Sequence, residues 1–202
     1  MAAAPEPRLA TPDDATQVID ILSEAFADDP VMCWMFGSGR PVRDLFNILT
    51  KHVYLQSGFG DVIDDCGAAL WLPASVKLHL SLWRQIELAS RVFANGGAGA
   101  VRRVMAAGDL LAANHPPEPH YYLFAVGVRR SAQGGGLGGA LVRTGLARAD
   151  KTGAAAYLEN SKPRNTPLYE RLGFQPTGLL PLPQGAPPLL AMLRPAAHGR
   201  AL

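Results

Sequence analysis

Apolar residues recur every three or four positions in three stretches of the first 115 residues, which predicts amphipathic helices. The first helix begins at Thr11-Pro12-Asp13-Asp14, where a hydroxyl cap, a proline and two acids favour a helix N-terminus, and it ends at residues 28–30. The second covers 42–53, and the third region, 75–113, is divided in two by Asn95-Gly96-Gly97. Its apolar positions are predicted to be core: Leu78, Leu82, Ile86, Leu88, Val92, Val101, Val104, Leu110 and Leu111. Three residues near its start, His79, Leu80 and Trp83, could contact substrate instead, although a core position is predicted for them too.

Short runs rich in β-branched and aromatic residues predict strands. The strand at 120–128, the helical pattern from Ala140 and the strand at 154–159 form a strand–helix–strand unit, so the two strands should be parallel. This alternation predicts a mixed α/β fold with one central sheet. Further strands are predicted at 8–10, as a hairpin at 58–64 and 68–72, and as a terminal hairpin at 174–180 and 189–194.

Two short segments near residue 30 each allow two interpretations. Asp28 and Asp29 could hold a cationic amine or could simply be solvated, and solvation is the commoner role of such acids. The run 31–36 is unusually apolar for a connector. It could line a substrate pocket, since pockets are largely apolar, or fill the core.

The length and composition predict a single globular domain. With 202 residues and a net charge of +2, the chain suits one domain over 7–202 after a flexible tail at 1–6, and nothing indicates nucleic acid or a membrane as partner. The two cysteines, Cys33 and Cys66, form neither a disulfide framework nor a metal-ligand spacing, so we expect no metal and a reduced, cytoplasmic setting.

A glycine-rich segment, 133–139, lies between the strand at 120–128 and the following helix. A strand, a glycine loop and a helix N-terminus in this order can cradle a phosphate, because backbone N–H groups approach the anion without Cβ atoms in the way. A plain flexible loop is one alternative. A dinucleotide fingerprint is another, with Glu159 on the ribose, but there the first glycine follows the strand almost directly, whereas here five residues intervene after Val128.

Two motifs resemble those of the GNAT family of N-acetyltransferases. Gln133-x-x-Gly136-x-Gly138 after a V-G-V strand end is similar to the family's acetyl-CoA loop, and the segment 165–174, N-T-P-L-Y-E-R-L-G-F, is similar to its later motif. The likeness extends over nearly the whole chain. Within the family it is greatest to the puromycin N-acetyltransferase-like proteins, through R-L-A-T-x-D-D and A-F-A-D-x-P, although Asp29 replaces a tyrosine there.

The resemblance implies a central mixed sheet whose two parallel central strands splay apart and admit the pantetheine arm of acetyl-CoA. The strand end would offer backbone groups to that arm, the glycine loop would receive the pyrophosphate, and Asn165 would contact the arm. Arg129 and Arg130 could add charge for the phosphates or could face solvent. The cofactor-binding residues predicted in this way are Val126, Gly127, Val128, Gln133, Gly134, Gly135, Gly136, Leu137, Gly138, Gly139 and Asn165.

Acetylation of an amine by a thioester requires a neutral amine, a donor to the oxyanion and a proton for the departing thiolate. Tyr169 matches the family's proton donor, and a phenol with a pKa of roughly 10 is protonated at neutral pH. A backbone N–H near Val128 is the predicted oxyanion donor. Glu159 is the candidate base, directly or through water, but it could instead pair with Arg164, and capture of the neutral fraction of the amine needs no base. His120, at the far end of its strand, ranks lower.

The sequence therefore predicts an acetyl-CoA-dependent N-acetyltransferase that acts on a small-molecule amine by direct attack in a ternary complex, as a monomer or homodimer. A non-catalytic acetyl-CoA-binding domain, used for interaction or sensing, is the alternative. A dinucleotide-dependent oxidoreductase is a third interpretation, which the loop spacing disfavours.

Overall fold

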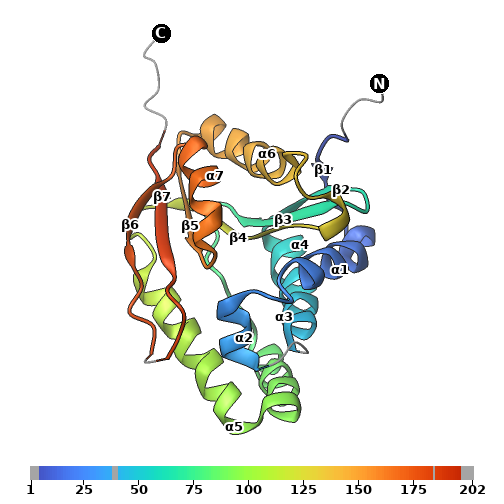
Figure 1. Ribbon diagram of the computed structural model, residues 1–202, viewed down its shortest axis with the longest axis vertical. Helices are drawn as coiled ribbons and strands as arrows, with labels where there is room; N and C mark the ends of the chain where they lie inside the picture. The colour runs from blue at the N-terminus through green and yellow to red at the C-terminus, as the bar shows by residue number, and fades with distance from the viewer. Residues whose placement is uncertain (1–4, 38–40, 184, 197–202) are drawn as a thin grey trace.

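The computed structural model describes residues 5–37, 41–183 and 185–196. Its centre is a mixed seven-stranded sheet with the strand order β1-β2-β3-β4-β5-β7-β6 (Figure 1). The predicted fold class is confirmed, and the predicted hairpins and the strand–helix–strand unit are all present. The strands are β1 (Arg8–Leu9), β2 (Phe59–Ile63), β3 (Gly67–Leu72), β4 (His120–Val128), β5 (Ala155–Asn160), β6 (Gln175–Leu179) and β7 (Leu190–Arg194).

Helices cover both faces of this sheet, with α6 and α7 on one side and α1 to α5 on the other (Figure 1). The strand residues alternate between the two cores: Leu70 and Leu72 pack with the α1–α5 layer, whereas Ala69 and Trp71 pack with the α6 layer. The helices are α1 (Ala15–Ala25), α2 (Pro30–Phe36), α3 (Pro41–Leu49), the π-helical turn η2 (Thr50–Tyr54), α4 (Leu55–Ser57), α5 (Leu82–Asn114), α6 (Leu137–Thr152) and α7 (Thr166–Arg171).

The two central strands, β4 and β5, run parallel but stay together for only part of their length. Their residues pair over 120–123 and 155–158 and then diverge. Beyond this point β4 remains paired with β3 as far as Val128, and β5 remains paired with β7 as far as Asn160. Because each strand follows a different neighbour, the sheet opens between them and leaves one edge of β4 without a strand partner.

The third helical region differs from its prediction at its N-terminal end. Residues 75–81 are not helical, and α5 begins at Leu82. The predicted break is confirmed, because Gly97 has a φ of +67° and kinks the helix. The predicted core role of Leu78, before the helix, is wrong, since this residue is 49% exposed. The same prediction is wrong for Leu82 and Ile86 on the helix, which are 68% and 51% exposed, and Trp83 is 80% exposed. Their spacing marks one helix face, but no described element packs on it.

The segment around residue 30 has a structural role that neither interpretation of its acids anticipated. Asp29 is buried, and its Oδ1 accepts hydrogen bonds from the backbone N–H groups of Val31 and Met32, so it caps α2. Asp28 pairs with Lys162 and Arg130 instead of facing water alone. Most apolar residues of the run 31–36 fill the core, as one of the two interpretations predicts: Val31, Met32, Met35 and Phe36.

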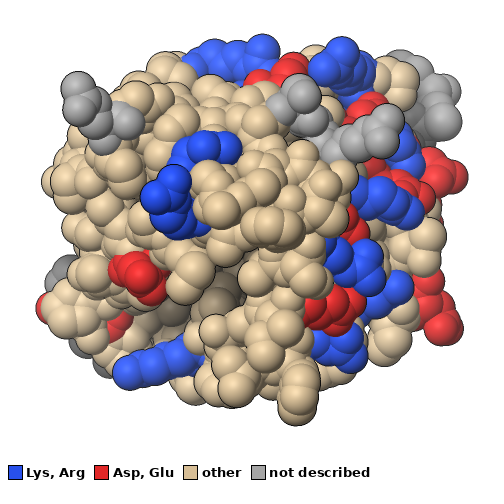
Figure 2. All heavy atoms as spheres, turned by 90° about the horizontal axis from the view of Figure 1, so that it is seen from below, with Lys and Arg blue, Asp and Glu red and all other residues tan. Residues whose placement is uncertain are grey.

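Charged side chains are unevenly distributed on the face that α5 and α2 form. Figure 2 views this face from below and shows charges of both signs gathered on the side where α1 and α3 lie, whereas the rest carries few. Ion pairs connect the helices of this layer, Arg91 of α5 with Asp44 of α3, and Arg43 of α3 with Asp20 of α1. No helix in the described ranges is long and apolar enough to span a membrane.

Candidate active site

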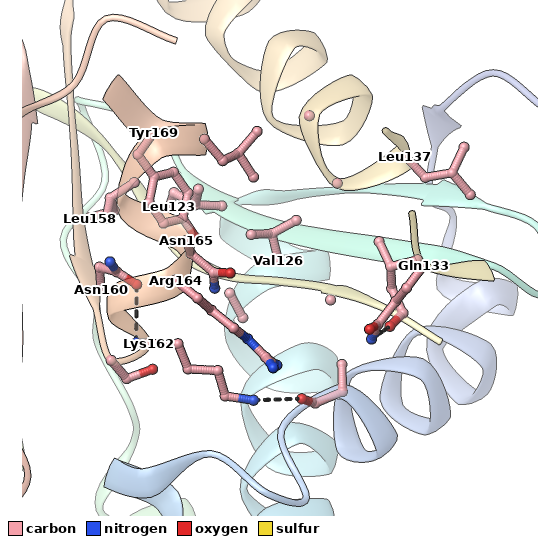
Figure 3. Close-up of a pocket in the computed structure, with 18 of the residues that line it drawn as sticks. Leu123, Val126, Gln133, Leu137, Leu158, Asn160, Lys162, Arg164, Asn165 and Tyr169 are labelled. Atoms are coloured by element: carbon pink, nitrogen blue, oxygen red, sulfur yellow. Dashed lines mark hydrogen bonds between the residues drawn. The ribbon is translucent and has the colours of Figure 1, made fainter. Parts of the chain in front are cut away.

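A cleft of about 350 Å³ lies where β4 and β5 diverge. In Figure 3, Tyr169, Asn165, Leu123 and Leu158 lie at one end of it, and Gln133 lies at the other end. The structure brings together on this cleft nearly all the site residues predicted from the sequence: Val126, Gly127, Val128, Gln133, Gly134, Gly136, Leu137, Gly138, Gly139, Glu159, Asn165 and Tyr169. Gly135 is the one predicted site residue that is not among the lining residues.

The glycine loop has the backbone conformation that its composition suggests. Gly134 and Gly136 have φ values of +89° and +77°, which favour glycine, and nothing lies within 4 Å of the position that a Cβ atom would take on either residue. Gly136 is the N-cap of α6, so the free N–H groups of that helix start face the cleft end of the loop. The amide of Gln133 donates to the carbonyl oxygen of Val128 at 3.0 Å and ties the loop to the strand end.

The cations near the cleft fall into two groups. Arg129 and Arg130, which the sequence left open between phosphate binding and solvent, are paired with Glu24 and Asp28, at the C-terminal end of α1 and just beyond it. Lys162, Arg164 and Arg171 line the cleft itself. In Figure 3 the side chain of Arg164 extends into the middle of the view, and Lys162 donates to the carbonyl oxygen of Ala25. Lys162 also pairs with Asp28, so Arg164 and Arg171 are the lining cations for which the described residues show no acid partner.

Tyr169 is positioned by α7 and packed from behind by Phe174, with the ring centroids 6.0 Å apart. The residue is 7% exposed and lines the cleft. Burial raises the pKa of its phenol well above 10, and the nearby Asp29 carboxylate raises the pKa further. The hydroxyl therefore keeps its proton throughout the physiological pH range.

Glu159 is the last residue but one of β5, and its side chain is 6% exposed. Its Oε2 accepts a hydrogen bond from the hydroxyl of Tyr122 at 2.8 Å, and its Oε1 lies 3.5 Å from Nε2 of His115. Burial raises the pKa of Glu159 to about 7, and the hydrogen bond from Tyr122 only partly offsets this. Among the described residues Glu159 forms no ion pair with Arg164, so the predicted alternative of a structural Glu159–Arg164 pair is wrong.

Several aromatic and imidazole residues around Glu159 were missed by the sequence analysis. Tyr54 of η2 lies near Glu159, and within the described residues its hydroxyl and Glu159 Oε1 are buried without a hydrogen-bond partner. Strand alternation carries a signal for two others, since Tyr122 and Tyr157 occupy positions on the same face of β4 and β5 as Glu159. His115 follows α5 in a proline-rich segment, and no local pattern marks it.

Comparisons with known proteins agree with this geometry. Residues 69–174 match the Acetyltransferase (GNAT) family. A Corynebacterium glutamicum structure, described as histone acetyltransferase HPA2 and related acetyltransferase, is 33% identical; the match covers 96% of this chain and 97% of that one, with a TM-score of 0.72. The chain therefore belongs to the GNAT acetyltransferase family and has its fold.

More distant solved structures share the fold at lower identity. A polyamine N-acetyltransferase of Drosophila melanogaster, which forms N-acetylagmatine, is 16% identical over 93% of this chain and 97% of that one, with a TM-score of 0.61. Arylalkylamine N-acetyltransferase 2 from Aedes aegypti is 14% identical over the same shares, with a TM-score of 0.60. At these identities the likeness concerns the fold alone.

Proposed function

We propose that this acetyltransferase transfers the acetyl group of acetyl-CoA to the amine of a small molecule, by direct attack with both substrates bound. One observation carries the proposal: the cleft between the diverging strands has a glycine loop at one end and, along its wall, a protonated phenol and a buried carboxyl, Tyr169 and Glu159. The solved relatives named as polyamine and arylalkylamine N-acetyltransferases support an amine as acceptor.

The residues of the cleft fit acetyl-CoA. The unpaired edge of β4 near Val126 and Val128 presents backbone groups suited to amide partners, and the loop glycines leave room for a pyrophosphate. Arg164 and Arg171 supply positive charge for its phosphates, whereas Lys162 is already paired with Asp28. When bound, acetyl-CoA supplies the activated acyl group, and the chain's task is to hold it and to move protons.

Two side chains divide the proton chemistry between them. Glu159, with a pKa near 7, is about half ionised at neutral pH and can accept a proton from the amine, which is the poise that general base catalysis favours. Tyr169 holds a proton at its Oη and can donate it to the leaving sulfur. Burial raises the pKa of both groups, and the carboxyl stays far more acidic than the phenol, which suits one base and one acid.

The charges of the cleft favour an acceptor with a single amine. Of the two acids among the described lining residues, Asp29 is already committed to the N-terminus of α2 and to the hydroxyl of Ser161. Glu159 is left to attract an ammonium group, and the aromatic rings of Phe26 and Phe124 line the same cleft. A polyamine would bring a second cation for which the described lining has no free carboxylate. We do not extend the puromycin likeness to the substrate, because Asp29 is a helix cap.

The test is acetyl transfer itself, measured as thiol release from acetyl-CoA with a panel of monoamines and diamines. We expect turnover with monoamines and weaker turnover with diamines of the same length. Binding of CoA without turnover on any amine would instead support the non-catalytic acetyl-CoA-binding alternative. Calorimetry should show CoA binding far more tightly than NAD, and tight NAD binding would contradict the assignment.

Gly136→Asp is the variant that tests whether the glycine loop binds CoA. Its Cβ meets no protein atom within 4 Å, so the fold should tolerate it apart from the strain of a positive φ, which costs roughly 1 kcal/mol. The added carboxylate would face the bound phosphates, and CoA affinity should be lost. Unchanged affinity in this variant would show that the loop does not hold the pyrophosphate.

A further inference from the structure

A line of three close contacts runs from buried Glu159 toward the surface. Glu159 Oε1 lies 3.5 Å from His115 Nε2, and His115 Nδ1 lies 3.1 Å from His120 Nε2. The Nδ1 atom of His120 lies 2.8 Å from the backbone carbonyl oxygen of Glu118. Exposure rises along this line, from 6% for the side chain of Glu159 to 26% for that of His115.

The carbonyl at the outer end determines where the ring protons lie. A carbonyl oxygen only accepts, so His120 must carry its proton on Nδ1 and present the lone pair of Nε2 to His115. His115 must then carry its proton on Nδ1. The Nε2 lone pair of His115 is therefore directed at Glu159 Oε1, and His115 can accept a proton from the carboxyl group.

The surroundings keep His115 uncharged at neutral pH and leave Glu159 partly protonated. The titratable groups that face Glu159 are Tyr54 from η2, Tyr122 from β4, Tyr157 from β5 and His115 from the segment after α5. Burial raises the pKa of Glu159 to about 7 and lowers that of His115 to about 4, so the proton rests on Glu159 and reaches His115 only transiently. Catalytic hydrogen bonds are often as long as 3.5 Å before a substrate binds.

We propose that His115 accepts from Glu159 the proton that Glu159 removes from the amine, and that His120 holds His115 in the tautomer this transfer needs. The proposal rests on the proposed function, and both histidines act through Glu159, so they are positioning residues. An ammonium substrate and acetyl-CoA yield an amide, a thiol and one proton. Of the two protons that leave the nitrogen, one replaces the proton that Tyr169 gives to the sulfur, and the other must leave the site. It passes from Glu159 Oε1 to His115 Nε2 and then to water, which restores the original Nδ1–H tautomer.

The first test needs no enzymatic activity. Long-range ¹H–¹⁵N correlation spectra of ¹⁵N-histidine-labelled protein should show the Nδ1–H tautomer for His115 and His120 at pH 7.5. His79, an exposed histidine outside the cluster, should show the Nε2–H form that predominates in free imidazole side chains. An Nε2–H form of His115 would overturn the proposal even if no acetylation is ever found, so its failure and that of the proposed function are distinguishable.

The second test uses variants of both histidines. His115→Gln should lower kcat by roughly tenfold to a hundredfold, at or below the lower end of what a positioned acid or base contributes, with the KM for the amine unchanged. Added imidazole should restore part of the rate. His120→Gln keeps an acceptor for His115 Nδ1–H and should retain most activity, whereas His120→Leu should resemble His115→Gln. His79→Gln is the neutral control, because His79 is exposed and is not among the residues that line the cleft.

The two outcomes against the proposal are distinct. Full activity and an unchanged pH profile in His115→Gln would exclude a role in proton release. An equal loss in both His120 variants, without rescue by imidazole, would reduce the pair to packing residues.

Discussion

Two parts of the chain, residues 120–174 as the first half and residues 30–119 as the second, differ in how function is encoded. The first half lines most of the cleft, whereas the second contributes side chains near Glu159 without lining the cleft. In 120–174 the site is mainly backbone: a strand end, a glycine loop, a helix N-terminus and one short helix that carries Tyr169. In 30–119 the contribution is made by isolated side chains, Tyr54 and the His115 that follows α5, which reach Glu159 from distant points of the chain. Under the proposed function, the first half would hold the cofactor and donate a proton, and the second would set the protonation of Glu159.

Tyr169→Phe tests the first half and has the largest expected effect. The ring and its contact with Phe174 remain, but the proton is lost, so turnover should fall by about a hundredfold to ten-thousandfold. CoA affinity should change little, because the loop and strand end carry that binding. The measurements are turnover with the best amine and CoA titration of both proteins.

Two results would reassign this residue. Near-normal turnover of Tyr169→Phe would mean that water or another group protonates the sulfur. A loss of CoA binding instead would make Tyr169 a cofactor contact.

Glu159→Gln tests the residue at which the two halves meet, and the quantity measured is the free energy of unfolding as a function of pH. The folded-state pKa of Glu159, about 7, is above its unfolded value of 4.5, so the folded state holds its proton more tightly. The contribution of this group to stability is complete below pH 4.5 and is lost as the pH rises to 7, a change of about 3 kcal/mol. The neutral amide does not ionise, so Glu159→Gln should be more stable than wild type by about this amount at pH 8.

Urea unfolding at pH 4.5 and pH 8 measures this difference. His115, whose folded pKa is lowered to about 4, also makes stability depend on pH and lies 3.5 Å from Glu159, so the comparison is repeated in a His115→Gln background, where that contribution is absent. A stability difference that does not change between the two pH values would show that Glu159 is solvated and ionised like an ordinary surface acid.

The sequence predicted the two halves unequally for a physical reason. Local patterns specify backbone: the glycine content and the V-G-V strand end predict the loop, and the strand pairing at 120–128 and 154–159 is confirmed. They do not specify which long-range neighbours a side chain meets. Nothing near His115 indicates Glu159, because that contact depends on how distant elements pack. Asp29 is a different case, since its cap bonds are local and an acid before Pro30 is a helix-start signal that the sequence analysis did not use.

The same limit explains the error at the start of α5. Helical spacing showed that Leu82 and Ile86 share a face, but whether that face is covered depends on a partner element that the pattern does not contain. The apolar face of α6, by contrast, packs on a sheet that includes β4 and β5, the strands on either side of α6 in the sequence. The burial of this face can therefore be predicted from the local pattern.

Matched glycine variants on these two helices should have opposite effects. On α6, a Cβ atom at Gly145 would overlap the fully buried indole of Trp71, so Gly145→Ala should destabilise by about 1–3 kcal/mol. On α5, Gly108 is exposed with open space at its Cβ position, and Gly108→Ala should stabilise by about 0.5–1 kcal/mol through helix propensity. Thermal and urea unfolding of both variants measure the difference, and the same sign for both would mean that the packing contrast is wrong.

The smallest effect is expected at Trp83, and it decides whether the apolar face of α5 is free. The residue is 80% exposed, so Trp83→Gln should change the free energy of unfolding by no more than about 0.5 kcal/mol. Trp71→Ala is the buried counterpart and should cost about 3–5 kcal/mol. Unfolding and sedimentation velocity should be measured on the same samples. If Trp83→Gln destabilises by more than 1 kcal/mol and also lowers the sedimentation coefficient, the start of α5 is covered by a second copy of the chain, and its apolar positions are core residues of a homodimer.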